Sequence, residues 1–129
     1  MIGLDTNVLV RYLVQDDPEQ SAVASAVFEE LDERQRGFVS LVVLVELHWV
    51  LRRAYRISAG EVLAIVDQLL RARELLVQEA DLVRRSWRQA MAGADLADAL
   101  VAELGIAAGC ESTVTFDQRA ATTLGMRQL

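Results

Sequence analysis

The sequence predicts an α/β fold in which a parallel central β-sheet of four to five strands is flanked by helices on both faces. Residues 1–4 form a short apolar strand, and a helical pattern follows at once. Short apolar runs then alternate with longer stretches of helical periodicity along the whole chain. The chain has 129 residues, of which 53% are hydrophobic, so we expect a single domain over residues 1–129 with its own core.

Capping and turn residues set the expected boundaries of each element. The clearest signals are Pro18 in a first helical turn, the capping box of Ser58 and Glu61, and Gly93 as a helix stop. Together with the apolar periodicity, they predict helices at residues 6–15, 18–33, 42–55, 58–73, 80–91, 95–105 and 119–124. Short apolar and β-branched runs between these helices predict strands at residues 1–4, 37–41, 74–78, 112–116 and 126–129.

The composition limits the kinds of site that the chain can form. One cysteine, Cys110, and one histidine, His48, are too few for a disulfide or a structural zinc site, so a metal would be a hard cation held by oxygen ligands. The net charge is −6 and all 13 basic residues are arginine, so there is no strong basic footprint for nucleic acid. Neither a membrane span nor a signal peptide is indicated, which points to the cytoplasm.

Four carboxylates are distinguished by their positions. Asp5 and Asp117 directly follow strands, at the edge where parallel sheets bind ligands. Glu46 interrupts an apolar helix face, and Asp98 lies one turn after Asp95 on a face that continues with apolar residues, so we expect it to point inward. Each has a simpler alternative, because the aspartates are also typical helix caps, and Glu46 could form a buried ion pair with an arginine or cap a neighbouring helix.

The four carboxylates suggest a specific chemistry if they meet at one sheet edge. Clustered carboxylates repel one another, and a divalent cation relieves that repulsion. Mg²⁺ or Mn²⁺ is commonly bound through a few carboxylates and completes its coordination shell with water and substrate phosphate. We therefore expect a phosphate ester as substrate and a metal-activated water as nucleophile.

Four short motifs in this order and spacing point to a known family. They are Leu4-Asp5-Thr6-Asn7, Leu44-Val45-Glu46-Leu47, Ala94-Asp95-Leu96-Ala97-Asp98-Ala99-Leu100 and Thr115-Phe116-Asp117. With them the chain resembles, over essentially its whole length, the PIN-domain ribonucleases and specifically the VapC-type toxins of bacterial toxin–antitoxin pairs.

The resemblance implies a metal-dependent site and several partners. Such toxins cut RNA endonucleolytically with Mg²⁺ or Mn²⁺, commonly in tRNA or ribosomal RNA, form homodimers, and are blocked by a VapB-like antitoxin. The implied catalytic and metal-binding residues are Asp5, Glu46, Asp98 and Asp117. Asp95 would be an auxiliary acid, and the positions that would support the carboxylates or metal waters are Thr6, Asn7, Ser40 and Thr115.

Other functions stay open at this point. A catalytically inactive PIN fold, a phosphoacceptor receiver-like signalling module, or a PIN-type fold acting on DNA would share the α/β outline. The receiver-like module is disfavoured because that family relies on a lysine and this chain has none. Two arginine groups, one within residues 52–56 and one within 84–88, could hold phosphates, although such groups are more often paired with nearby acids. The apolar helix at residues 8–14 fits either a two-sided core position or a partner surface.

Overall fold

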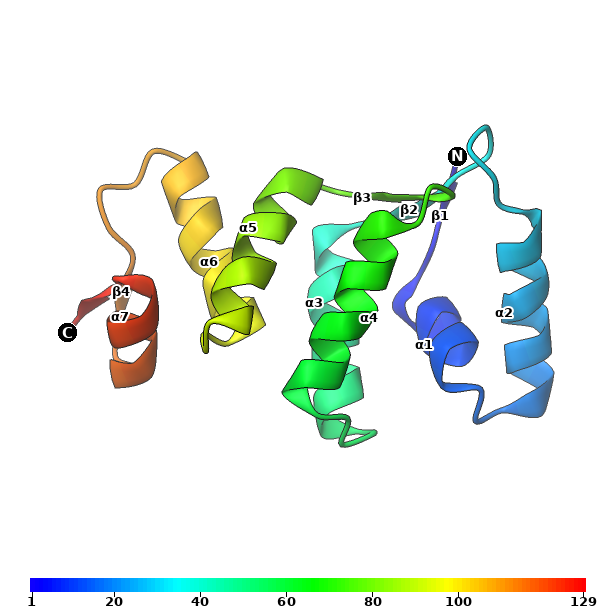
Figure 1. The fold of residues 1–129 in the computed structure, drawn as a ribbon, viewed down its shortest axis with the longest axis horizontal. Coiled ribbons are helices and arrows are strands. Elements are labelled where there is room, and N and C mark those ends of the chain that lie inside the picture. The colour runs from blue at the N-terminus through cyan, green and yellow to red at the C-terminus, as the bar shows by residue number, and fades with distance from the viewer. The chain divides into compact units, whose positions relative to one another are not determined.

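The computed structural model of the protein describes all 129 residues and contains seven helices and five short strands (Figure 1). The elements in chain order are β1 (Ile2–Gly3), α1 (Thr6–Val14), α2 (Pro18–Glu30), β2 (Gly37–Val39), α3 (Leu41–Arg53), α4 (Ala59–Arg71), β3 (Leu75–Val77), α5 (Ala80–Met91), α6 (Leu96–Ala107), β4 (Val114–Thr115), α7 (Gln118–Leu124) and β5 (Arg127–Gln128). Every predicted helix and strand is present, and all strand pairs are parallel. The α/β fold class is therefore confirmed.

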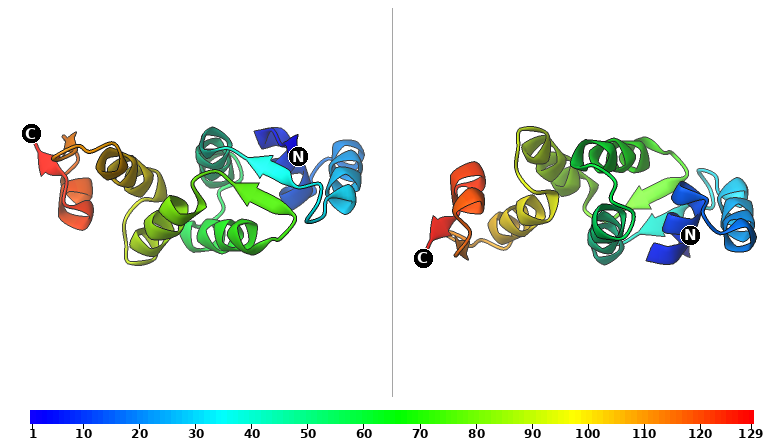
Figure 2. Two further views of the ribbon diagram at one scale, coloured as in Figure 1. Left: turned by 90° about the horizontal axis from the view of Figure 1, so that it is seen from above. Right: turned by 90° about the horizontal axis from the view of Figure 1, so that it is seen from below.

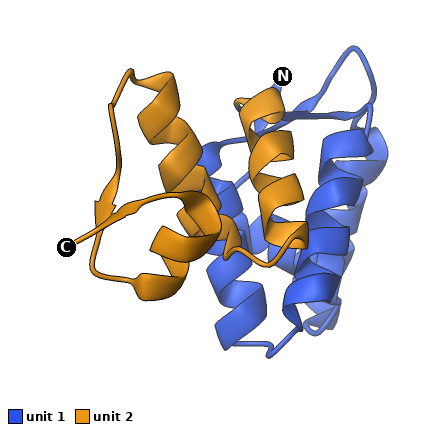
Figure 3. Ribbon diagram, turned by 60° about the vertical axis from the view of Figure 1, so that its left-hand side comes forward, with its two compact units in different colours: residues 1–78 blue, residues 79–129 orange.

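The chain divides into two compact units, residues 1–78 and residues 79–129 (Figure 3). The first contains β1 to β3 and α1 to α4, and the second contains α5 to α7 with β4 and β5. Three of the predicted strands pair in the first unit, and the other two pair in the second. The single domain over residues 1–129 stays a prediction, and each unit is described by itself.

The sheet of the first unit has the order β1-β2-β3. Figure 2 shows β2 and β3 side by side, and Phe38 of β2 is in register with Gly3 of β1 and with Leu76 of β3. Gly37 starts the central strand with no room for a side chain, because a Cβ there would lie 2.7 Å from Leu4 Cδ1 and 2.9 Å from Leu31 Cδ1. The missing side chain lets these leucines close over the strand.

Helix α1 is covered on two sides, by α2 and by α3. Leu9 is fully buried, and Tyr12 stacks on Phe28 of α2 with ring centroids 3.9 Å apart. The two-sided core position that the apolar sequence predicts for this helix is confirmed. The most deeply buried side chains of the first unit are Leu9, Val39, Leu44, Leu47, Leu51, Val62 and Val66.

The second unit is built on the packing of α5 against α6. Arg85 of α5 forms an ion pair with Glu103 of α6, with 3.1 Å between Nε and Oε2. Strands β4 and β5 pair beside α7, and Ala102, Ala120 and Met126 form a small buried cluster. This cluster attaches the C-terminal elements to α6 through apolar contacts.

Several predicted boundaries differ from the structure by one to three residues, and two of these differences have a clear physical cause. Helix α2 ends at Glu30 instead of about residue 33, because Leu31 leaves the helix with an extended backbone and buries its side chain. Asp32 then accepts hydrogen bonds from two backbone amides and forms a turn. The second strand is also shorter than predicted, since Ser40 already caps α3. Both boundaries depend on burial and capping beyond the local pattern.

Candidate active site

Asp5 lies between β1 and α1 as the N-cap of the helix. Its Oδ1 accepts a hydrogen bond from the Thr6 amide at 2.8 Å, whereas a capping side chain normally reaches the second or third amide of the helix. Its second carboxylate oxygen accepts no hydrogen bond, and the side chain is exposed. Asp5 therefore has an oxygen available for a ligand, and the simple capping explanation accounts for only part of its arrangement.

Glu46 on α3 is joined to α1 through Thr6. The buried Thr6 hydroxyl donates a hydrogen bond to Glu46 Oε2 at 3.1 Å. Glu46 interrupts an apolar helix face as expected, but its side chain is exposed, and its neighbours Val42 and Trp49 are 68% and 38% exposed. No arginine pairs with Glu46, so the predicted alternative of a buried ion pair is wrong.

The other two supporting residues of the first unit have different surroundings. Asn7 is exposed on α1 and makes no hydrogen bond through its side chain. Ser40 is the N-cap of α3, where its Oγ accepts from the Val43 amide at 3.1 Å. Ser40 thus fixes the start of the helix that carries Glu46, two turns before it.

Asp95 and Asp98 lie at the start of α6 in the second unit. Asp95 is the N-cap, and its Oδ1 accepts from the Asp98 amide at 3.0 Å. Asp98 is half-buried on the first turn. Its face is less buried than predicted, because Ala102 is buried but Val101 is 54% exposed. The caps and acids in this turn also suit the positive end of the helix dipole.

Asp117 lies between β4 and α7 and caps that helix. Its Oδ1 accepts from the Ala120 amide at 3.0 Å, and its own amide donates to Thr115 Oγ1 at 3.0 Å. Arg119 of α7 donates to the Gly93 carbonyl at 2.7 Å, which ties α7 to the turn in front of α6. The elements that carry Asp117 and Asp95 are therefore linked directly.

Each unit thus brings some of the predicted residues together. Asp5, Thr6 and Glu46 are connected in the first unit, and the second unit carries the acids of α6 and α7. All of these side chains offer oxygen donors, which fit Mg²⁺ or Mn²⁺ better than softer metals. Neither unit by itself has three carboxylates grouped closely enough to hold a metal ion.

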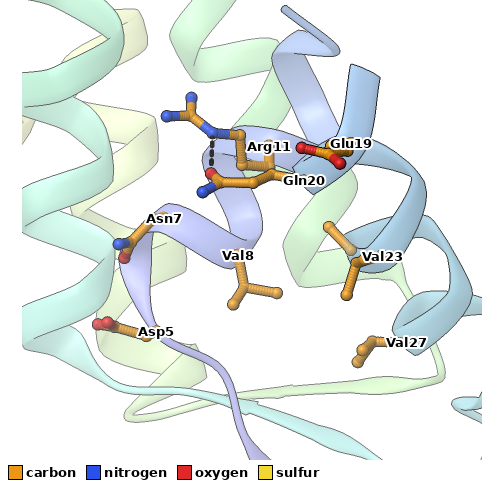
Figure 4. Close-up of a pocket in the computed structure, with 9 residues that line it drawn as sticks. Asp5, Asn7, Val8, Arg11, Glu19, Gln20, Val23 and Val27 are labelled. Atoms are coloured by element: carbon orange, nitrogen blue, oxygen red, sulfur yellow. Dashed lines mark hydrogen bonds between the residues drawn. The ribbon is translucent and has the colours of Figure 1, made fainter. Parts of the chain in front are cut away.

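Two grooves open beside α1. The α1–α2 groove, shown in Figure 4, is lined by Asp5, Asn7, Val8, Arg11, Glu19, Gln20, Val23, Ala24 and Val27. The α1–α3 groove is lined by Thr6, Asn7, Val10, Arg11, Glu46, Val50, Ala54 and Tyr55. Asn7 and Arg11 belong to both grooves, and they lie one helical turn apart on the same face of α1.

The arginine groups named from the sequence differ in their partners. Arg84 pairs with Asp81 at 3.0 Å and Arg85 pairs with Glu103, as expected for side chains paired with acids. In the other group, Arg52 donates to the Ile57 carbonyl and Arg53 lies 4.1 Å from the centroid of the Trp49 ring. The pairing expectation is therefore confirmed for Arg84 and Arg85, and it is wrong for Arg52 and Arg53.

The sequence did not lead us to expect the hydrogen-bond network of Arg11. Its Nη1 donates to Asp16 Oδ1 at 3.2 Å and to the Tyr55 hydroxyl at 3.1 Å, and its Nε donates to Gln20 Oε1 at 2.7 Å. The Tyr55 hydroxyl also donates to Asp16 Oδ2, and this hydrogen bond is the main cause that lowers the pKa of Asp16. The available signal was that Arg11 is the one charged residue within the apolar stretch 8–14.

Comparison with known families gives one result. The family model described as PIN domain matches residues 2–123, which include parts of both units. Proteins with this domain are generally nucleases, typically dependent on divalent metal ions. A search of curated proteins finds no significant match. None of the helices combines the length and the apolar character needed to cross a membrane.

Proposed function

Because the chain belongs to the PIN domain family, we propose that it is a Mg²⁺- or Mn²⁺-dependent endoribonuclease. Its catalytic and metal-binding carboxylates would be Asp5, Glu46, Asp98 and Asp117. The observation that carries the proposal is that Thr6 contacts both acids: its hydroxyl holds Glu46, and its amide donates to one oxygen of Asp5 while the other oxygen stays unengaged.

We assign each residue a metal-binding or a supporting role. Asp5 and Glu46 would hold the metal ion from the first unit, and the Thr6 hydroxyl orients Glu46 by occupying one of its oxygens. Asp98 and Asp117 would add the remaining carboxylates, with Asp95 and Thr115 fixing the backbone around them. Asn7 and Ser40 would support this set. When bound, Mg²⁺ or Mn²⁺ would supply water activation and charge stabilisation at the scissile phosphate.

The finer assignment is a VapC-type toxin that inhibits translation by cutting tRNA or ribosomal RNA in the cytoplasm. A VapB-like antitoxin would neutralise it, and the α1–α2 groove supports this proposal because it is lined by the apolar side chains of Val8, Val23 and Val27 as well as by Asp5. Val23 is 68% exposed, so an apolar partner helix could bury it. A homodimer is proposed on the resemblance alone.

The test is cleavage of total RNA by the purified protein with Mn²⁺ or Mg²⁺, beside the same reaction in EDTA and with Asp5→Asn. We expect discrete fragments that vanish in both controls. Arg71→Gln is a matched surface variant that should cleave normally, since the Arg71 side chain is exposed at the end of α4 and pairs only with Asp67 of the same helix. Absence of cleavage by the folded wild-type protein, with tRNA and ribosomes supplied, would favour a catalytically inactive PIN fold.

A further inference from the structure

We propose that Arg11 is a binding residue for a backbone phosphate of the RNA substrate, beside the acidic residues of the first unit. This inference rests on the proposed ribonuclease function and adds a contact that positions the nucleic acid. It is carried by the position of Arg11, by the way its guanidinium is held, and by the charge of its surroundings.

The position of Arg11 is unusual among the 13 arginines. It is the single basic side chain in the α1–α2 groove and also the single one in the α1–α3 groove. The first groove includes Asp5 and the second includes Glu46. Figure 4 shows Asp5, Asn7 and the Arg11 guanidinium along the same side of α1. A strand of RNA that reaches the acids through either groove would therefore pass Arg11.

The guanidinium is held in a fixed orientation and still has donors to spare. Of its five N–H groups, the one on Nε is used by Gln20, and Nη1 donates to Asp16 and Tyr55. Nη2 donates to no protein group, and the side chain is 28% exposed. Two N–H donors therefore remain for a ligand, and an arginine already fixed by its neighbours loses little conformational entropy when it binds phosphate.

The negative charge around Arg11 explains why a phosphate contact there would help RNA to bind. The chain has a net charge of −6, and the grooves beside α1 contain Asp5, Glu19 and Glu46. A polyanionic substrate is repelled by these carboxylates, and a fixed cation beside them offsets part of that repulsion. Arginine is well suited to this task because its planar donors match the oxygens of a phosphate group.

A purely structural role is the alternative, because Arg11 also links α1 to the start of α2 and to the end of α3. The structural role and the phosphate-binding role predict different effects of Tyr55→Phe on RNA binding. That change removes a hydrogen bond from the Arg11 and Asp16 network without changing the charge. If Arg11 is only structural, Arg11→Gln and Tyr55→Phe should alter stability and RNA binding in parallel. If Arg11 binds phosphate, only Arg11→Gln should alter the salt dependence of RNA binding.

The experiment measures binding of purified total tRNA at several NaCl concentrations with Mg²⁺ present. The full chain carries Asp117→Asn in every sample to prevent cleavage, since asparagine can still cap α7. Arg11→Gln should weaken binding about tenfold and reduce the slope of log Kobs against log[NaCl] by about 1. Arg11→Lys should keep most of the slope, because the charge is retained, and should recover only part of the affinity.

Two control variants test whether the change in slope is specific to the charge of Arg11. Arg71→Gln removes the same charge away from both grooves and should leave the slope unchanged. Tyr55→Phe should also leave the slope unchanged, and thermal unfolding confirms that each variant is folded. An unchanged slope in a folded Arg11→Gln protein, or an equal loss in Arg71→Gln, would overturn the role of Arg11. Cleavage by the wild-type protein is scored separately, so its absence would count against the ribonuclease proposal alone.

Discussion

Asp5 and Asp117 both lie between a short strand and the helix that follows it, but they cap their helices differently. Each follows a short strand and caps the next helix from an extended backbone. Asp117 accepts from the third amide of its helix, which is the usual cap, while Asp5 accepts only from the adjacent amide. Each of them uses Oδ1 and leaves its second oxygen without a hydrogen bond. An aspartate directly after a strand can therefore form the usual N-cap hydrogen bond, as Asp117 does, or only a bond to the adjacent amide, as Asp5 does. Both acids keep one oxygen for a ligand, and they differ in how well they cap the helix that follows.

The largest expected effect is on the RNA cleavage rate, which distinguishes metal-binding acids from acids that only cap helices. Each single change of Asp5, Asp98 or Asp117 to Asn, or of Glu46 to Gln, should lower the RNA cleavage rate roughly 10²–10³-fold, because each removes a carboxylate from the proposed metal site. The measurement is the initial cleavage rate under Mn²⁺ saturation of the wild type. A normal rate for Asp117→Asn would mean that Asp117 is a cap and nothing more.

A smaller loss is expected when the link between Thr6 and Glu46 is cut. Thr6→Val keeps the shape of the side chain and removes the hydroxyl that holds Glu46, so the cleavage rate should fall about 10–100-fold. Thr6→Ser keeps the hydroxyl and should retain most of the rate. A normal rate for a folded Thr6→Val protein would show that the hydrogen bond to Glu46 does not matter for cleavage.

The two caps should also differ in stability. Asp117→Ala removes a well-placed cap and should lower the free energy of unfolding by about 1 kcal/mol, whereas Asp5→Ala should cost less than about half of that. Urea denaturation of both variants at neutral pH measures the difference. Equal losses would show that the Asp5 cap is as strong as that of Asp117 and would weaken the contrast between them.

The smallest expected effect concerns the network around Arg11. The pKa of Asp16 is lowered chiefly by the hydrogen bond from Tyr55 and also by its own backbone amide and by Arg11. A lowered pKa in the folded state means that the ionised carboxylate stabilises the fold at neutral pH and that this contribution is lost as the pH falls below about 4. Tyr55→Phe should therefore make stability less dependent on pH between about 5 and 2, as urea denaturation across that range would show.

The sequence predicted those features that depend on local signals. Ser58 and Asp95 cap helices as expected, and α5 ends at Met91 before Gly93. These boundaries follow from capping residues within a few positions of one another, so the order and type of all the elements could be read directly. The positions of the acidic motifs relative to strands and helices could be predicted for the same reason.

Features that depend on distant contacts could not be predicted. Glu46 is exposed and held by Thr6, which lies 40 positions earlier, and no helical periodicity carries that information. Arg11 depends on Tyr55, which lies 44 positions later. Helix α2 ends early because Leu31 is buried, which is also a consequence of tertiary packing. Candidate residues could thus be named from the sequence, while their hydrogen bonds required coordinates.

The most direct measurement is calorimetric titration of Mn²⁺ into the folded wild type, Asp5→Asn, Glu46→Gln and Arg71→Gln, without RNA. The account predicts that wild type and Arg71→Gln bind Mn²⁺ alike and that both carboxylate variants bind it at least about tenfold more weakly. Mn²⁺ affinity that is the same in all four proteins would contradict the claim that Asp5 and Glu46 hold the metal ion.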